Sequence, residues 1–136
     1  MVDEERLLRL LDGVRRDVAR IRERAEQQRD PVGLDAVKYR FITAIEGAAR
    51  AAHHIAVSEG WATPESNADA FRVLASNRVI GADVADRMSQ AAGFRNVLVH
   101  QYVEVDDDLV IAGVDRLSDL ASFTTQVADW LRQTAG

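Results

Sequence analysis

The feature that most constrains the fold is the helical spacing of apolar residues over the first thirty positions. Apolar side chains recur at intervals of four and three residues, so on a helix of 3.6 residues per turn they form a single stripe. The stripe consists of Leu7, Leu11, Val14, Val18, Ile21 and Ala25. The opposite face is rich in Arg and Glu, which is typical of a surface that faces solvent. We therefore predict one amphipathic helix over residues 3–28.

The next segment carries signals for both ends of a second long helix, over residues 31–58. Asp30 directly precedes Pro31. An Asp can cap the free backbone amides of a helix, and a Pro suits the first helical turn. Gly60 follows the last apolar position and provides a stop signal. We expect this helix to be buried along one side, because apolar and small residues recur along it at helical spacing.

Three further helices are expected downstream. They are a short helix with Phe71 on its apolar face, a fourth helix over residues 82–102 and a last helix over residues 109–134. An acidic loop, residues 104–108, separates the last two. We find no internal repeat and no flexible linker. The sequence therefore predicts an all-α fold, a bundle of four long helices and one short helix, which forms a single domain over residues 1–136.

Composition excludes several classes of protein. The chain has no cysteine, which rules out disulfides, thiolate metal sites and a cysteine nucleophile. No apolar run approaches the ~20 residues of a membrane span, and the acidic N-terminus does not resemble a signal peptide. We expect a cytoplasmic protein with no membrane partner. The net charge of −5 argues against an ordinary nucleic-acid binder, although residues 101–136, with two basic and seven acidic side chains, account for the whole deficit.

Familiar catalytic and cofactor motifs are also missing. The sequence has no Gly-rich phosphate loop and no G-x-S-x-G elbow. His53 and His54 are adjacent, so on a helix they point about 100° apart and cannot hold one metal ion together. We interpret His54 as a core histidine that bonds to the backbone. Neither a metal site nor a bound cofactor is expected.

One segment concentrates chemically active side chains near the end of the fourth helix. It reads Arg-Asn-Val-Leu-Val-His-Gln-Tyr and spans residues 95–102. Asn96 and His100 are four residues apart and share a helix face, whereas Arg95 lies about 140° from His100 around the axis. A site that uses both is easier to form if a second copy faces the first, so the pattern favours a two-fold homodimer. The simpler interpretation, that both side chains only pair with carboxylates, stays open.

This segment resembles the motif of Arg, four residues, His, one residue and Tyr that is found in the HepT toxins. These are HEPN-superfamily ribonucleases of the HepT–MntA toxin–antitoxin systems. The resemblance extends to the flanking residues 91–94 and 103–106 and to the second helix, and it covers nearly the whole chain in helix order and length. The sequence differs at Arg50 and His53, where the family often has an acidic residue and an Asn. The resemblance implies a HEPN-like bundle.

The resemblance also implies a metal-independent endoribonuclease that acts on RNA such as tRNA or mRNA, and not on DNA. In such enzymes the 2′-OH of the RNA attacks the adjacent phosphorus. His100 would transfer protons, and Arg95 would bind the phosphate and stabilise its developing charge. Asn96 would orient the imidazole or contact a phosphate oxygen. Glu46 would hold Arg95 in place.

Tyr102 completes the motif, and the resemblance implies a regulatory role for it. In the HepT-like pattern this tyrosine receives AMP from the cognate nucleotidyltransferase, an MntA-like antitoxin. Its position near a helix end favours an accessible hydroxyl. The alternative is a non-catalytic helical protein that binds nucleotide and partners a nucleotidyltransferase, which the acidic net charge favours. A bundle whose dimerisation is purely structural is the third interpretation.

Overall fold

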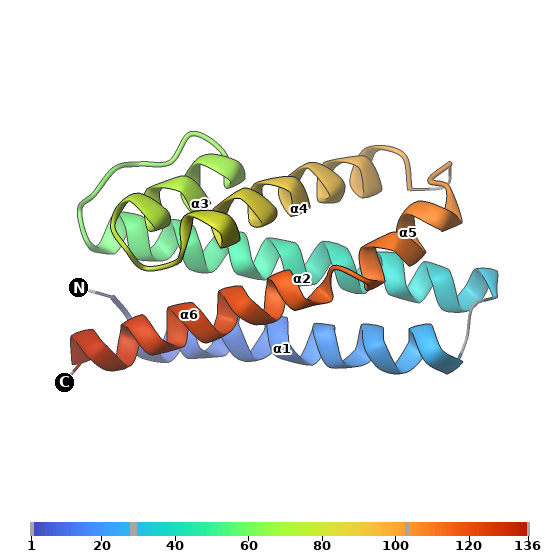
Figure 1. Cartoon of the computed structure of the whole chain (residues 1–136), viewed down its shortest axis with the longest axis horizontal. Coiled ribbons are helices and arrows are strands. Elements are labelled where there is room, and N and C mark those ends of the chain that lie inside the picture. Colours follow the sequence, from blue (N-terminus) through green and yellow to red (C-terminus); the bar gives the residue numbers. More distant parts are fainter. Residues whose placement is uncertain (1, 28–29, 103, 136) are drawn as a thin grey trace.

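The computed structural model describes residues 2–27, 30–102 and 104–135 of the chain. They form a bundle of six helices, and no strand occurs among these residues (Figure 1). The helices are α1 (Glu4–Gln27), α2 (Pro31–Ser58), α3 (Asn67–Ser76), α4 (Ala82–His100), α5 (Asp107–Val114) and α6 (Leu117–Ala135). The all-α prediction is confirmed, but the number of helices is six and not five.

The first helix buries the predicted stripe. All six apolar residues of the stripe are at most 7% exposed, and α1 packs along most of α2, which lies above it in Figure 1. Gly47 allows the two helices to approach closely, because a Cβ at that position would lie 3.1 Å from a methyl group of Val14. The start of α1 is within one residue of the prediction, and residue 28 lies outside the described residues.

The central helix, α2, contacts each of the other five helices. Both of its predicted end signals are confirmed. The side chain of Asp30 accepts a hydrogen bond of 2.8 Å from the backbone N–H of Gly33. At the other end Gly60 adopts a φ of 70°, and the N–H of Trp61 donates back to the carbonyl of Ala56 at 3.0 Å. This is the Schellman motif, in which glycine adopts the positive φ without steric strain.

The last helix is where the prediction was wrong. The chain turns between α5 and α6, around Asp115, so the predicted helix over 109–134 is two helices. Gly113, near the end of α5, packs on an edge-to-face pair formed by Phe41 and Phe94, whose ring centroids are 5.4 Å apart. A Cβ on Gly113 would lie 3.1 Å from Phe94. The break lets α5 cover this aromatic pair while α6 packs against α1, α2 and α4.

The fourth helix ends two residues earlier than predicted, at His100. Tyr102 therefore lies in the turn that follows α4 and leads towards α5. Val97 and Val99, the β-branched residues of its last turn, are helical, and Leu98 between them is fully buried. In the described part of the chain, no helix is long and apolar enough to cross a membrane.

Candidate functional site on helices α2 and α4

The best-defined polar contact of the motif joins Arg95 on α4 to Glu46 on α2. Arg95 Nη2 and Nε donate to the same carboxylate oxygen, Glu46 Oε1, at 2.6 and 3.2 Å. Nη1 donates to Oδ1 of the neighbouring Asn96 at 3.1 Å. The Arg95 side chain is 25% exposed and that of Glu46 is 30% exposed. The guanidinium is thus held in one orientation while part of it remains open to solvent, and the contact expected between Glu46 and Arg95 is present.

His100 lies at the C-terminal end of α4 with its side chain exposed. It makes no hydrogen bond or ion pair with any other residue that the structure describes. It follows Arg95 by five positions, which corresponds to about 7.5 Å along the axis and about 140° around it. The structure therefore brings Arg95, Asn96 and Glu46 together within one chain and leaves His100 apart. Asn96 accepts from Arg95 through its oxygen, and its amide nitrogen remains free to donate to a ligand or to the imidazole.

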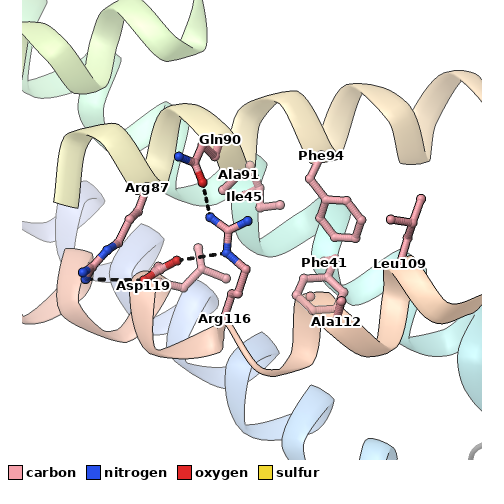
Figure 2. A pocket seen from close by; sticks show the side chains of 12 residues that line it. Phe41, Ile45, Arg87, Gln90, Ala91, Phe94, Leu109, Ala112, Arg116 and Asp119 are labelled. Atoms are coloured by element: carbon pink, nitrogen blue, oxygen red, sulfur yellow. Dashed lines mark hydrogen bonds and ion pairs between the residues drawn. The ribbon is translucent and has the colours of Figure 1, made fainter. Parts of the chain in front are cut away.

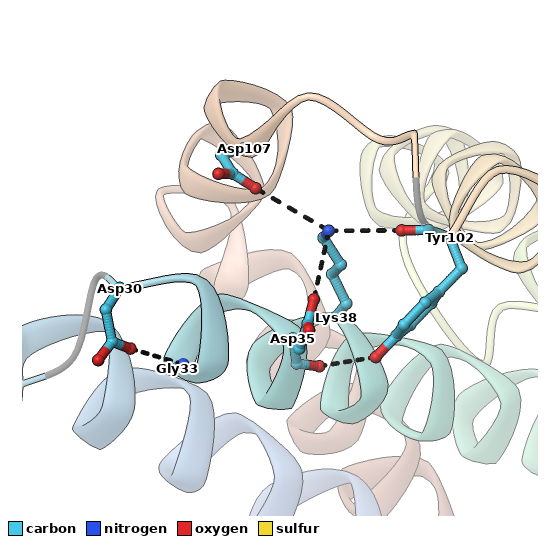
Figure 3. A network of polar contacts seen from close by, with 6 residues as sticks. All are labelled: Asp30, Gly33, Asp35, Lys38, Tyr102 and Asp107. Atoms are coloured by element: carbon cyan, nitrogen blue, oxygen red, sulfur yellow. Dashed lines mark hydrogen bonds and ion pairs between the residues drawn. The ribbon is translucent and has the colours of Figure 1, made fainter.

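Tyr102 is hydrogen-bonded to residues near the start of α2 (Figure 3). Its hydroxyl donates a 3.0 Å hydrogen bond to the backbone carbonyl of Asp35. Its own carbonyl accepts one of 3.4 Å from the ammonium of Lys38, which also lies 5.6 Å from the centre of the tyrosine ring. The same ammonium is 3.6 Å from the Asp35 carboxylate and 3.9 Å from that of Asp107 on α5. The hydroxyl is therefore engaged as a hydrogen-bond donor, although this bond lies at the exposed surface of the molecule.

The environment of Tyr102 also changes its acidity. Partial burial raises the pKa of the Tyr102 hydroxyl above its usual value, and the nearby negative charge of Asp35 raises it further. The hydroxyl is protonated at neutral pH, as its role as hydrogen-bond donor requires.

Lys38 is the residue of this region that the sequence analysis missed. It is only 4% exposed, which is unusual for a lysine. The signal was in the composition: sixteen of the seventeen basic residues are arginine, and Lys38 is the only lysine. A compact ammonium on a flexible stem meets three oxygens in a narrow space more easily than a planar guanidinium does.

The two histidines of α2 have separate partners. A ring nitrogen of His53 lies 3.2 Å from Oδ1 of Asn67, at the start of α3. His54 Nε2 accepts a 3.0 Å hydrogen bond from the backbone N–H of Asp3. The predicted bond of His54 to the backbone is confirmed, although its side chain is half-buried and not in the core. Within the described residues, no three His, Asp or Glu side chains are grouped as a metal ion would require.

A separate apolar hollow of about 150 Å³ lies between α2, α4, α5 and α6 (Figure 2). Phe41 and Phe94 form part of its wall. At its rim, Arg87 and Arg116 approach the carboxylate of Asp119 to 3.8 and 3.7 Å. Phe94 lies on a different side of α4 from Asn96 and His100, so this hollow is distinct from the surface that carries the motif.

Solved structures share this arrangement of helices. The tri-AMPylated HEPN toxin of Shewanella oneidensis, in complex with MNT antitoxin, superposes with a TM-score of 0.84 at 25% sequence identity, over 95% of this chain and 99% of that one. The cytosolic protein of unknown function YutE from Bacillus subtilis superposes with a TM-score of 0.86 at 18% identity, over 98% and 93% of the two chains. The fold is therefore that of the HEPN toxins.

Sequence comparisons narrow this class to a family. The chain is 34% identical over 73 residues to the mRNA nuclease HepT of Shewanella oneidensis, which is 53% of this chain and 55% of that protein, so the match spans about half of that relative. The model of the family described as Ribonuclease HepT-like matches residues 7–127. The chain belongs to this HepT-like ribonuclease family.

Proposed function

We propose that this chain is the ribonuclease toxin of a toxin–antitoxin pair. In this proposal it cleaves RNA without a metal ion, in a cleft at a homodimer interface, and a nucleotidyltransferase antitoxin silences it by transferring AMP to Tyr102. The observation that carries the proposal is the ion pair in which Glu46 holds the Arg95 guanidinium. Arg95 precedes the exposed His100 by five positions, and the chain is HepT-like. The relatives described as an mRNA nuclease and as an AMPylated toxin with its antitoxin support the two halves.

The proposed chemistry needs only groups that the chain supplies. A guanidinium has five N–H donors, and three of those of Arg95 are engaged by Glu46 and Asn96. The remaining two are available to bind a phosphate, where they would stabilise the charge that develops as the RNA 2′-OH attacks phosphorus. His100 takes the proton from the 2′-OH or gives one to the leaving 5′ oxygen. Its solvent exposure allows both exchanges.

A dimer would complete the site, because Arg95 and His100 of one chain point in different directions. If two α4 helices meet about a two-fold axis, the Arg95 of one chain can face the His100 of the other. The exposed surface of α4 around Val97, which is 38% exposed, is available for such a contact. Mixing Arg95→Ala chains with His100→Ala chains should then restore part of the cleavage activity that each variant lacks.

The modification of Tyr102 would be a transfer of AMP from ATP. The tyrosine oxygen attacks the α-phosphorus, the bond to pyrophosphate breaks, and the phenolic proton leaves. Since the hydroxyl donates to Asp35 and its pKa is raised, the transferase must first free it from that carbonyl and must provide a base. The attached phosphodiester then adds bulk and negative charge close to the motif, which opposes binding of an RNA backbone.

The direct test is incubation of the purified protein with total RNA and with tRNA in the presence of EDTA. Cleavage by the wild type that is lost in both Arg95→Ala and His100→Ala, at unchanged helicity, is the expected result. Cleavage that stops with EDTA, or persists in either variant, would show that the mechanism is wrong. Binding of nucleotide without any cleavage would instead favour the alternative, a non-catalytic helical partner of a nucleotidyltransferase, which the net charge of −5 supports.

A further inference from the structure

The face of α2 that holds Arg95 continues beyond Glu46. Glu46, Arg50 and His53 follow one another at four- and three-residue intervals, so all three lie on the same side of the helix. Arg50 is one turn from Glu46, about 6 Å along the axis. A ligand that contacts Arg95 therefore has a basic side chain as its next neighbour on α2.

Arg50 lines a shallow hollow of about 320 Å³ beside the first turns of α1. Its lining includes Arg50, His53 and His54 from α2 and Arg6 from α1. The two histidine rings are fixed by Asn67 and by the N–H of Asp3, as described above. The hollow thus has an ordered wall, with an arginine contributed by each of the two helices.

The two guanidinium groups of the hollow are not neutralised. Arg6 and Arg50 are exposed, and neither guanidinium forms an ion pair or a hydrogen bond with a described residue. Elsewhere, arginines such as Arg40, Arg87 and Arg95 are paired with carboxylates. Two unpaired guanidiniums that share one hollow make a locally positive site in a chain of net charge −5, and an anion with several oxygens is the ligand that such groups bind best.

We propose that Arg6 and Arg50 bind backbone phosphates of the single-stranded RNA that the Arg95 site cleaves, and so extend the substrate-binding surface along α2 towards the start of α1. This inference rests on the proposed function. The continuity with Arg95 favours a polymer over a free anion, because one strand can contact both places. The openness of the hollow agrees with a strand that passes over it. The two arginines are binding residues and take no part in proton transfer.

Two consequences distinguish this surface from the cleavage site. A dinucleoside monophosphate has a single phosphate, which the Arg95 site takes, so none is left for the hollow and its cleavage does not depend on Arg6 or Arg50. A longer RNA contacts both, so loss of the two arginines raises its KM and leaves kcat nearly unchanged. Each lost phosphate contact also lowers the salt dependence of binding, by about 0.7 in the slope of log K against log salt for single strands.

The experiment measures binding of a labelled single-stranded RNA of about 12 nucleotides by fluorescence anisotropy at several salt concentrations, in a His100→Ala background that does not cut. Arg6→Gln, Arg50→Gln and the double variant are compared with Arg22→Gln, an exposed arginine near the other end of α1. We expect the double variant to weaken binding roughly tenfold and to lower the salt slope by about 1.4. The Arg22 variant should change neither, and thermal melting should show that all variants are folded.

Affinities and slopes of the double variant that match those of the Arg22 control would overturn the inference, whether or not the wild type cleaves. The same holds if the double variant binds RNA normally and fails only to bind the antitoxin, because the hollow would then be a protein contact. Equal losses for dinucleotide and long RNA in kcat would also contradict it. If the wild type cleaves no RNA, the proposed function fails, but the binding comparison still decides whether Arg6 and Arg50 hold an RNA strand.

Discussion

Replacing Lys38 by Met tests whether this buried lysine anchors the Tyr102 turn. Methionine has a similar length and is apolar, so it fills the space of the lysine stem and removes only the ammonium. The change leaves the Tyr102 carbonyl without its 3.4 Å donor. It also removes the charge that lies between the carboxylates of Asp35 and Asp107.

The magnitude follows from the exposure of the partners. The two carboxylates are 61% and 55% exposed, so each ion pair is screened by solvent and contributes about 0.5 kcal/mol. The hydrogen bond to the Tyr102 carbonyl is long and adds about 1 kcal/mol. Relief from burying an ammonium offsets part of this sum. We expect a net loss of about 1 kcal/mol in the free energy of unfolding, and a Tm lower by roughly 4 °C.

The local effect is the sharper readout. Urea unfolding of Lys38→Met measures the global change, and amide hydrogen exchange of the turn after α4 measures the local one. We expect exchange around Tyr102 to accelerate more than in the core, and the antitoxin to modify Tyr102 faster because the hydroxyl is freed more often. An equally stable or more stable variant with unchanged exchange in this turn would refute the anchoring role, since the ammonium would then be a buried charge without structural benefit.

Three further predictions concern the motif and its surroundings. Glu46→Gln should lower the rate of RNA cleavage at least tenfold, because it releases Arg95. The free energy of unfolding, measured by urea denaturation, should change by less than about 1 kcal/mol, because the ion pair is partly exposed. Gly93→Ala should raise the free energy of unfolding by about 0.5–1 kcal/mol, since its Cβ would meet nothing within 4 Å; Gly113→Ala, whose Cβ would lie 3.1 Å from a phenylalanine ring, should show no such gain. Tyr102→Phe should stay toxic and resist the antitoxin, and intact-mass spectrometry after co-expression should show added AMP on the wild type alone.

Local patterns predicted the elements whose ends are determined locally. The bounds of α2 match the prediction because a capping Asp30 and a glycine with positive φ, Gly60, act within a turn of each end. The sequence did not predict the break between α5 and α6, because apolar residues continue at helical spacing across it, from Val114 to Leu117. Gly113, just before the break, packs on an aromatic pair, and one of those rings comes from α2, so no local pattern reveals this contact.

The candidate site divides in the same way. The motif residues and the contact between Glu46 and Arg95 were expected from the sequence and its resemblance to a family. The role of Lys38 was not expected, because its partners Tyr102 and Asp107 are more than sixty residues away along the chain. Only the fold brings α2, the end of α4 and the start of α5 to one place.

Lys38 and Glu46, which hold Tyr102 and Arg95, both lie on α2, and we call them the two anchors of the motif. Their spacing explains why both ends of the motif are held. Lys38 and Glu46 are eight residues apart on α2, about 12 Å along the axis. Their partners Arg95, on α4, and Tyr102, in the turn after α4, are seven residues apart. α2 and α4 run antiparallel, so the two contacts fasten opposite ends of the motif and leave His100 between them free. Because the anchors are this far apart and share no partner, the effects of Glu46→Gln and Lys38→Met on unfolding should add within about 0.5 kcal/mol. A larger coupling energy in this double-mutant cycle would mean that the motif moves as one body, and that release of Tyr102 for modification also disturbs Arg95.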